Sequence, residues 1–193
     1  MNPLLQNINE IYQAIQQYIA PSAAEWIALQ KLDPAQQKAF LVATNEARHR
    51  YGEAVVTAQH LLPMLTPEEL IEGYTEGTAL LQRNISGYMV MHFQRAYIPL
   101  MTKEVQHQAA HTGATFLRAL VNHMGQEASP LIIECLVGNT DELREVALVA
   151  VAELRLHAAV PIIRGMMNDT NPSMREVARQ VLLDMNSDYN EDS

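Results

Sequence analysis

Hydrophobic residues recur at every third or fourth position along most of the chain, which is the spacing of one face of an α-helix. No segment alternates apolar and polar residues between turn clusters, as a half-buried strand would. The pattern therefore predicts an all-α fold. In the N-terminal half, cap residues and prolines mark helix starts, and helices are expected over Pro3 to Ile19, Ser22 to Leu32, Pro34 to about Leu62, and Pro67 to Ile98.

The last of these stretches carries three glycines, Gly73, Gly77 and Gly87. Because glycine weakens helices, one long helix and two helices with a bend both fit the pattern. We expect an N-terminal helical region over residues 1–98, helical repeats over 99–185, and a disordered acidic tail over 186–193, where no apolar stripe remains.

The C-terminal half repeats itself with a period of 31 residues. Pro130 falls on Pro161 at the start of a first helix, and a loop rich in Asn, Asp and Thr precedes a second helix in both units. Each unit is therefore predicted to be an αα-hairpin, and stacked hairpins form a superhelix. A further shift by the same period places a degenerate third unit over Pro99 to Met124.

The second helices carry the pattern apolar-Arg-x-x-Ala, as Leu143-Arg144-Glu145-Val146-Ala147 and Met174-Arg175-Glu176-Val177-Ala178. This pattern resembles the short HEAT repeats named for phycobilin lyases, and the resemblance covers about Pro130 to Met185. It implies that Arg144 and Arg175 are structural, because the arginine of that family commonly pairs with a loop acid and neighbouring backbone. Asp141 and Asp169 are the candidate acids.

Stacked hairpins expose their second helices along an extended surface that suits the binding of another chain. If Leu143, Ala147 and Leu154 point inward, the outward positions of the two second helices are expected to contact a partner. These positions are Glu145, Leu148, Ala152, Glu176, Arg179 and Leu183. The predicted function is non-catalytic protein–protein interaction, as an adaptor, a chaperone-like protein or an immunity-type module. For each residue, an ordinary solvated helix face is the alternative interpretation.

Charge and composition narrow the kind of partner. Thirteen Lys and Arg against 22 Asp and Glu give a formal net charge of −9, which disfavours nucleic acids and acidic membranes and favours a basic protein partner. The single cysteine, Cys135, lies in an apolar run and is expected in the core, which suits a reducing, cytoplasmic compartment. No apolar stretch approaches 18 residues and no basic residue precedes Lys31, so neither a transmembrane helix nor a signal peptide is expected.

Two Glu-x-x-His pairs, Glu46 with His49 and Glu104 with His107, support an alternative function. Ferritin-like enzymes build a di-iron site from two such pairs and two further glutamates. The missing ligands could come from Glu10 or Glu25 and from Glu72 or Glu76. This alternative is a di-iron, oxygen-dependent carboxylate enzyme.

Helical periodicity argues against a buried metal site. Glu46 and His49 lie away from the apolar face of their helix, and Glu104, His107 and His111 are expected to share a face opposite Val105 and Phe116. Both pairs are therefore expected to face solvent. Since the chain also lacks the motifs of serine hydrolases, P-loop proteins and dinucleotide-binding enzymes, the main interpretation has neither catalytic residues nor a cofactor.

Overall fold

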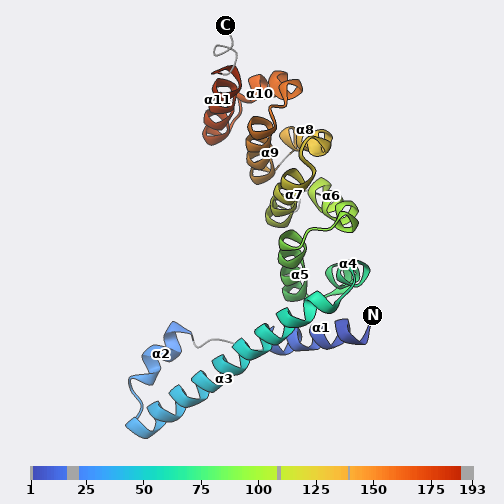
Figure 1. Ribbon diagram of the computed structural model, residues 1–193. Coiled ribbons are helices and arrows are strands. Elements are labelled where there is room, and N and C mark those ends of the chain that lie inside the picture. The colour runs from blue at the N-terminus through green and yellow to red at the C-terminus, as the bar shows by residue number, and fades with distance from the viewer. Residues whose placement is uncertain (1, 17–21, 108–109, 139, 188–193) are drawn as a thin grey trace. The chain divides into compact units, whose positions relative to one another are not determined.

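The computed structural model describes residues 2–16, 22–107, 110–138 and 140–187. Within these residues the chain is all-α (Figure 1). They form two compact units, Met1–Tyr88 and Met89–Ser193. The division falls ahead of Ile98, the boundary expected from the sequence.

Unit 1 holds the helices that capping signals predict. In chain order they are α1 (Pro3–Gln16), α2 (Ala23–Leu29), α3 (Pro34–Leu61), α4 (Pro67–Glu76) and the greater part of α5 (Ala79–Met91). Ser22, Asp33 and Thr66 each accept a hydrogen bond from the backbone three residues on, which confirms the predicted starts of α2, α3 and α4. The last three residues of the first predicted helix, up to Ile19, lie outside the described residues.

The glycine-rich stretch forms two helices. Gly77 ends α4 with an extended backbone (φ −77°, ψ 170°), and its N–H donates to the carbonyl oxygen of Gly73 at 3.0 Å. Gly73 itself lies where α4 approaches α1 and α5 closely: a Cβ there would come within 2.6 Å of Leu5 and 2.8 Å of Ile85. Leu5 and Ile85 are fully buried and belong to the core of unit 1.

Unit 2 is built from three αα-hairpins. They are α6 (Ile98–Gln106) with α7 (Ala110–Met124), α8 (Ser129–Leu136) with α9 (Asp141–Leu154), and α10 (Val160–Met166) with α11 (Pro172–Ser187). A turn of 3-10 helix precedes each first helix, and Pro99, Pro130 and Pro161 occupy the second position of the three first helices. The degenerate stretch from Pro99 to Met124 is thus a hairpin of the same form as its neighbours.

The 31-residue period is also the period of the core of unit 2. Met101, Ile132 and Ile163 are equivalent positions of the first helices, and all three are fully buried. Phe116, Ala147 and Ala178 are equivalent positions of the second helices, and they are fully buried too. Repeated burial at one position is expected when similar units stack on one another.

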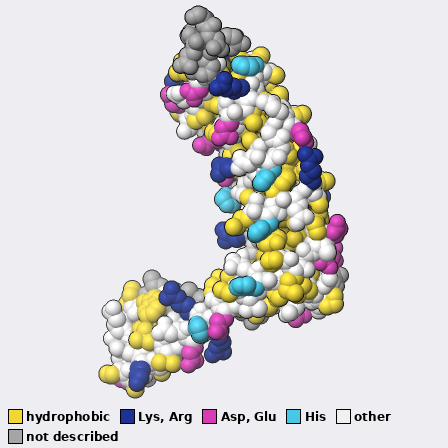
Figure 2. Space-filling model, viewed as in Figure 1, with side chains coloured by type: hydrophobic (Ala, Val, Ile, Leu, Met, Phe, Trp, Pro, Cys, Tyr) yellow, Lys and Arg dark blue, Asp and Glu magenta, His cyan; other side chains and the backbone are white. Residues whose placement is uncertain are grey.

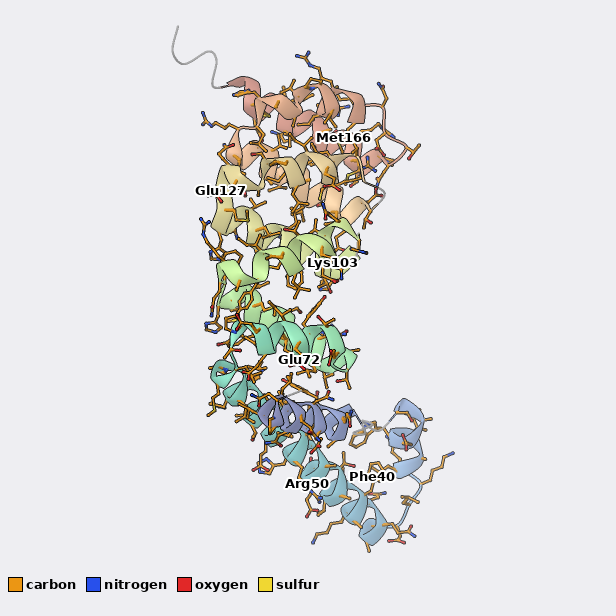
Figure 3. The ribbon with its side chains drawn as sticks, turned by 90° about the vertical axis from the view of Figure 1, so that its right-hand side faces the viewer. Phe40, Arg50, Glu72, Lys103, Glu127 and Met166 are labelled. Carbon is orange, nitrogen blue, oxygen red and sulfur yellow. The ribbon has the colours of Figure 1, made fainter. Side chains whose placement is uncertain are left out.

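The helices of unit 2 form two layers. Each first helix contacts its own second helix, and the second helices contact one another, α7 with α9 and α9 with α11 (Figure 1). The labels of Lys103 on α6 and Met166 on α10 mark the first and third hairpins, and Glu127 lies in the turn before the second (Figure 3). The middle helix α9 is therefore enclosed on three sides, by α7, α8 and α11.

Two further expectations concern the chain end and membranes. Helix α11 runs to Ser187, so Asn186 and Ser187 are helical rather than disordered, and the remainder of the predicted tail, 188–193, lies outside the described residues. Among the residues that the structure describes, no helix combines the length and apolar character needed to cross a bilayer.

Candidate functional site

The second helices of unit 2 expose most of the residues predicted to contact a partner. Glu145, Glu176 and Arg179 are exposed, and 57% of Leu183 is accessible. Ala152 is half-buried. In Figure 2 charged and histidine side chains lie along the edge of unit 2 where Figure 1 places these helices.

Leu148 is fully buried, so the prediction that it faces a partner is wrong. Helix α9 contacts α7 and α11 as well as α8, and a helix with neighbours on three sides buries more than one stripe of residues. The equivalent residue one period later is Arg179, on the last described helix, where no further described hairpin covers it. The exposed stripe of α9 instead follows Glu145, Val149 and Glu153.

A groove of about 530 Å³ lies between α7 and α9. Its buried lining consists of small apolar side chains, Ala114, Val121, Val146 and Ala150, and 46% of Val149 is accessible within it. Polar side chains line the rest: His111, Thr115, Arg118 and Asn122 from α7, and Glu142, Glu145 and Glu153 from α9. We call this set the α7–α9 groove.

The charges of the α7–α9 groove are only partly paired. Glu142 is engaged by His111, whose Nδ1 lies 3.3 Å from its Oε1. The side chains of Glu145 and Glu153 form no hydrogen bond or ion pair within the described part of the chain. The side chain of Arg118 on the opposite wall forms none there either. The groove thus presents two unneutralised carboxylates above an apolar floor.

Sequence reasoning found Glu145 but missed the residues around it. Arg118 lies 31 positions before Val149, so the degenerate third unit already places these two at equivalent positions, but Val149 was not among the residues predicted to contact a partner. Glu153 lies eight positions after Glu145 on the same exposed side of α9. The predicted set continued from Glu145 to Leu148 and Ala152, each one residue before the exposed Val149 and Glu153, and so it did not include Glu153.

Arg144 binds both candidate acids, whereas the hydrogen bonds of Arg175 go to backbone carbonyl oxygens of the loop before α11. Arg144 donates to Asp141 at 2.8 Å and forms an ion pair with Asp169, which confirms both predicted partners. Arg175 donates to the backbone carbonyl oxygens of Asp169 at 2.7 Å and Thr170 at 3.3 Å. These bonds join α9 and α11 through the loop that precedes α11.

Asp169 is the centre of this network. Its Oδ1 accepts a hydrogen bond from the backbone N–H of Asn171 at 2.8 Å, and Asn171 in turn donates to Asp141 at 2.7 Å. The hydrogen bond from Asn171 and, next, that from Arg144 hold the pKa of Asp169 below its ordinary value. The carboxylate is therefore stabilised in its ionised form in the folded protein.

We expect Asp169→Asn to lower the stability of unit 2 most at neutral pH. Because the pKa of Asp169 is lower in the folded protein than in the unfolded chain, its contribution is present above the unfolded pKa and is lost as the pH falls through the folded pKa. Urea unfolding between about pH 6 and about pH 3 should show the gap between wild type and Asp169→Asn closing. Glu145→Gln is the control, and a gap that is constant with pH would contradict this role of Asp169.

The two Glu-x-x-His pairs lie in different units. Glu46 and His49 are exposed on α3, where Glu46 pairs with Arg50 at 3.6 Å and His49 with Glu53 at 3.3 Å. This exposure confirms that the first pair faces solvent. Among the described residues, no group of three or more His, Cys, Asp or Glu side chains is placed to hold a metal ion.

The second pair differs from its predicted arrangement. Glu104 is half-buried on α6, and the exposed His107 caps that helix, its Nδ1 2.6 Å from the carbonyl oxygen of Lys103. His111 belongs to α7, so the prediction that these three residues share one helix face is wrong. Helix α6, the first helix of its hairpin, ends at Gln106, and α7 begins at Ala110.

Cys135 is a buried residue of α8. Burial, together with the nearby charge of Glu134, raises the pKa of its thiol to about 11. The thiol is therefore protonated at neutral pH, as expected of a core residue rather than a nucleophile.

Comparison of the chain with protein-family models, with curated proteins and with solved structures returned no match.

Proposed function

We propose that this protein recognises a partner protein through the exposed side of α7, α9 and α11. The observation that carries this proposal is the α7–α9 groove, in which Glu145 and Glu153 have no partner among the described residues and lie above an apolar floor. We call the exposed side of these three helices the recognition surface. The protein acts as an adaptor, chaperone-like or immunity-type module, and it binds the partner without catalysing a reaction.

The recognition surface combines the two ingredients of a selective interface. Exposed apolar atoms, such as those of Val149 and Leu183, gain free energy when a partner removes them from water. Unneutralised carboxylates reject acidic partners and speed the approach of basic ones. The formal net charge of −9 acts in the same direction at long range, so the partner has basic character.

The repeated architecture supports the same function. The resemblance of residues 130–185 to short HEAT repeats agrees with the hairpins and with the arginine contacts in unit 2. Stacks of such hairpins offer extended surfaces for other chains. The single reduced cysteine, Cys135, suits a cytoplasmic location, and we place the interaction there.

Charge reversal in the groove tests the proposal. The double variant Glu145→Lys/Glu153→Lys should lower the recovery of a specific co-purifying protein about tenfold or more when the tagged chain is isolated from its native cells. Quantitative mass spectrometry of the purified material measures this. Since both side chains are exposed and unpaired, the free energy of unfolding should change by no more than about 0.5 kcal/mol.

Glu68→Lys/Glu76→Lys is the matched control. These two exposed glutamates have the same spacing on α4, so this variant makes the same charge change in unit 1. It should recover the partner as wild type does. If no protein is recovered in a manner that depends on the groove, the proposed function is wrong.

A further inference from the structure

We propose that the α7–α9 groove binds an amphipathic helix of the partner, with Lys or Arg residues seven or eight positions apart on one side. This inference rests on the proposed function and adds the shape and the charge pattern of the bound segment. It is derived from the spacing of the carboxylates, the backbone of the groove walls, and the size of the side chains on its floor.

The two unpaired carboxylates set the spacing. Glu145 and Glu153 are eight residues apart on α9, which corresponds to about 12 Å along the helix axis. On a second helix lying along α9, residues seven positions apart return to nearly the same side after about 10 Å, and residues eight positions apart still share one broad face after about 12 Å. Basic residues with that spacing can therefore reach both carboxylates at once.

Val149 lies halfway between the two carboxylates and is the most exposed apolar residue of the groove lining. A bound helix with basic residues at both ends of this stretch presents the residues three and four positions along over Val149. An apolar side chain there would remove Val149 from water. The expected segment therefore reads basic, apolar, basic along one side.

The walls of the groove favour a helix over an extended peptide. Both walls are α-helices, whose interior N–H and C=O groups are already bonded within α7 and α9. An extended peptide buried there would find no backbone partners for its own N–H and C=O groups, each of which costs free energy when left unsatisfied. A helix satisfies these groups internally and needs only side-chain contacts, as in other helix-in-groove interfaces.

The floor of the groove lets a third helix come close. Ala114 of α7 and Ala150 of α9 are buried and small, so side chains of a bound helix can enter between the two walls. Interaxial distances of about 8 to 10 Å are usual when helices pack through small side chains. At this distance the bound helix covers Val149, whose accessible surface supplies the apolar part of the binding free energy.

The opposite wall fixes the rotation of the bound helix about its own axis. Arg118 stands on α7, facing the groove, and has no partner among the described residues. A helix with basic residues toward α9 and an acidic or neutral residue toward Arg118 meets complementary charge on both walls. The reverse rotation would place like charges together, which is the repulsive element that specificity needs.

Photo-crosslinking identifies the bound segment. Val149 is replaced by p-benzoylphenylalanine in the full chain, the protein is irradiated in its native cells, and the linked peptide is sequenced. Val137→p-benzoylphenylalanine is the control, because this valine is exposed in unit 2 but lies outside the groove. We expect Val149 to capture one partner segment with Lys or Arg seven or eight positions apart, and Val137 not to capture it.

The captured segment is then tested as a synthetic peptide against the full chain. We expect the peptide to gain helical circular dichroism on binding, and Glu145→Lys/Glu153→Lys to weaken its affinity about tenfold or more. Changing the two basic residues of the peptide to Glu should restore the affinity for this variant and lower it for wild type. Arg118→Ala should change the affinity less than the double variant does.

The outcomes separate this inference from the proposed function. A captured protein segment that lacks the basic spacing, or that binds without gaining helix, overturns the inference but leaves protein recognition standing. A captured nucleic acid, or a polyamine found in the groove by native mass spectrometry, overturns both. Absence of any Val149-dependent crosslink to another protein also overturns both.

Discussion

Leu148→Asp is expected to lower the free energy of unfolding of unit 2 by more than about 4 kcal/mol. Leu148 is fully buried, and α9 contacts α7, α8 and α11. A carboxylate at this fully buried position loses its contact with water, so it must stay buried at a high cost or unfold its surroundings. Urea unfolding followed by far-ultraviolet circular dichroism measures the change.

Leu183→Asp is the control for this prediction. Leu183 is a leucine of the neighbouring second helix with 57% of its surface accessible, so the same substitution there should cost no more than about 0.5 kcal/mol. Leu148→Ala extends the test to a milder change and is expected to cost about 2 to 5 kcal/mol. Equal, small effects at Leu148 and Leu183 would show that Leu148 is exposed, as the pattern of α9 had suggested.

Gly77→Ala is expected to destabilise unit 1 by about 1 to 3 kcal/mol. A Cβ at this position would lie 2.3 Å from the carbonyl oxygen of Gly73 and 2.7 Å from a methyl group of Leu81. The oxygen belongs to the backbone and accepts the hydrogen bond that ends α4, so it cannot move without loss. The junction between α4 and α5 must therefore shift, and thermal or urea unfolding would report the cost.

Gly87→Ala provides a control of opposite sign. Gly87 is an exposed residue of α5, and a Cβ there meets nothing within 4 Å. Alanine should therefore stabilise the helix by about 0.5 to 1 kcal/mol. If both substitutions change stability in the same direction, the close approach of neighbouring atoms is not the reason that glycine occupies position 77.

In unit 2, charged side chains that form ion pairs and those that form none are expected to differ in their effects on stability and binding. Arg144 bonds both Asp141 and Asp169 and so ties α9 to the loop before α11, and these contacts stabilise the fold. The side chains of Glu145 and Glu153 lie on the same helix and form no hydrogen bond or ion pair with the described residues. Variants of the first set should therefore alter stability, whereas variants of the second set should alter binding.

Signals within the amino-acid sequence were enough to predict the helices and the repeat. Ser22, Asp33 and Thr66 mark helix starts because a cap acts on the backbone two or three residues away, which is information held within one segment. The period of the hairpins was found by matching the sequence to itself, since a shift of 31 residues places Pro130 on Pro161. The partners of Arg144 could be named because the resemblance to short HEAT repeats implies that this arginine pairs with a loop acid, and Asp141 and Asp169 lie in the predicted loops.

The exposed side of α9, in contrast, could not be predicted from the sequence. Residues 146–151 of this helix are all apolar, so a 3.6-residue period cannot distinguish the side of Leu148 from that of Val149. The choice is made by the packing of α9 against helices that lie outside its own segment, α7 and α11 among them, which leaves Leu148 buried and Val149 accessible. The α7–α9 groove and its unpaired carboxylates arise in the same way, because a glutamate's lack of a partner depends on every chain segment folded around it.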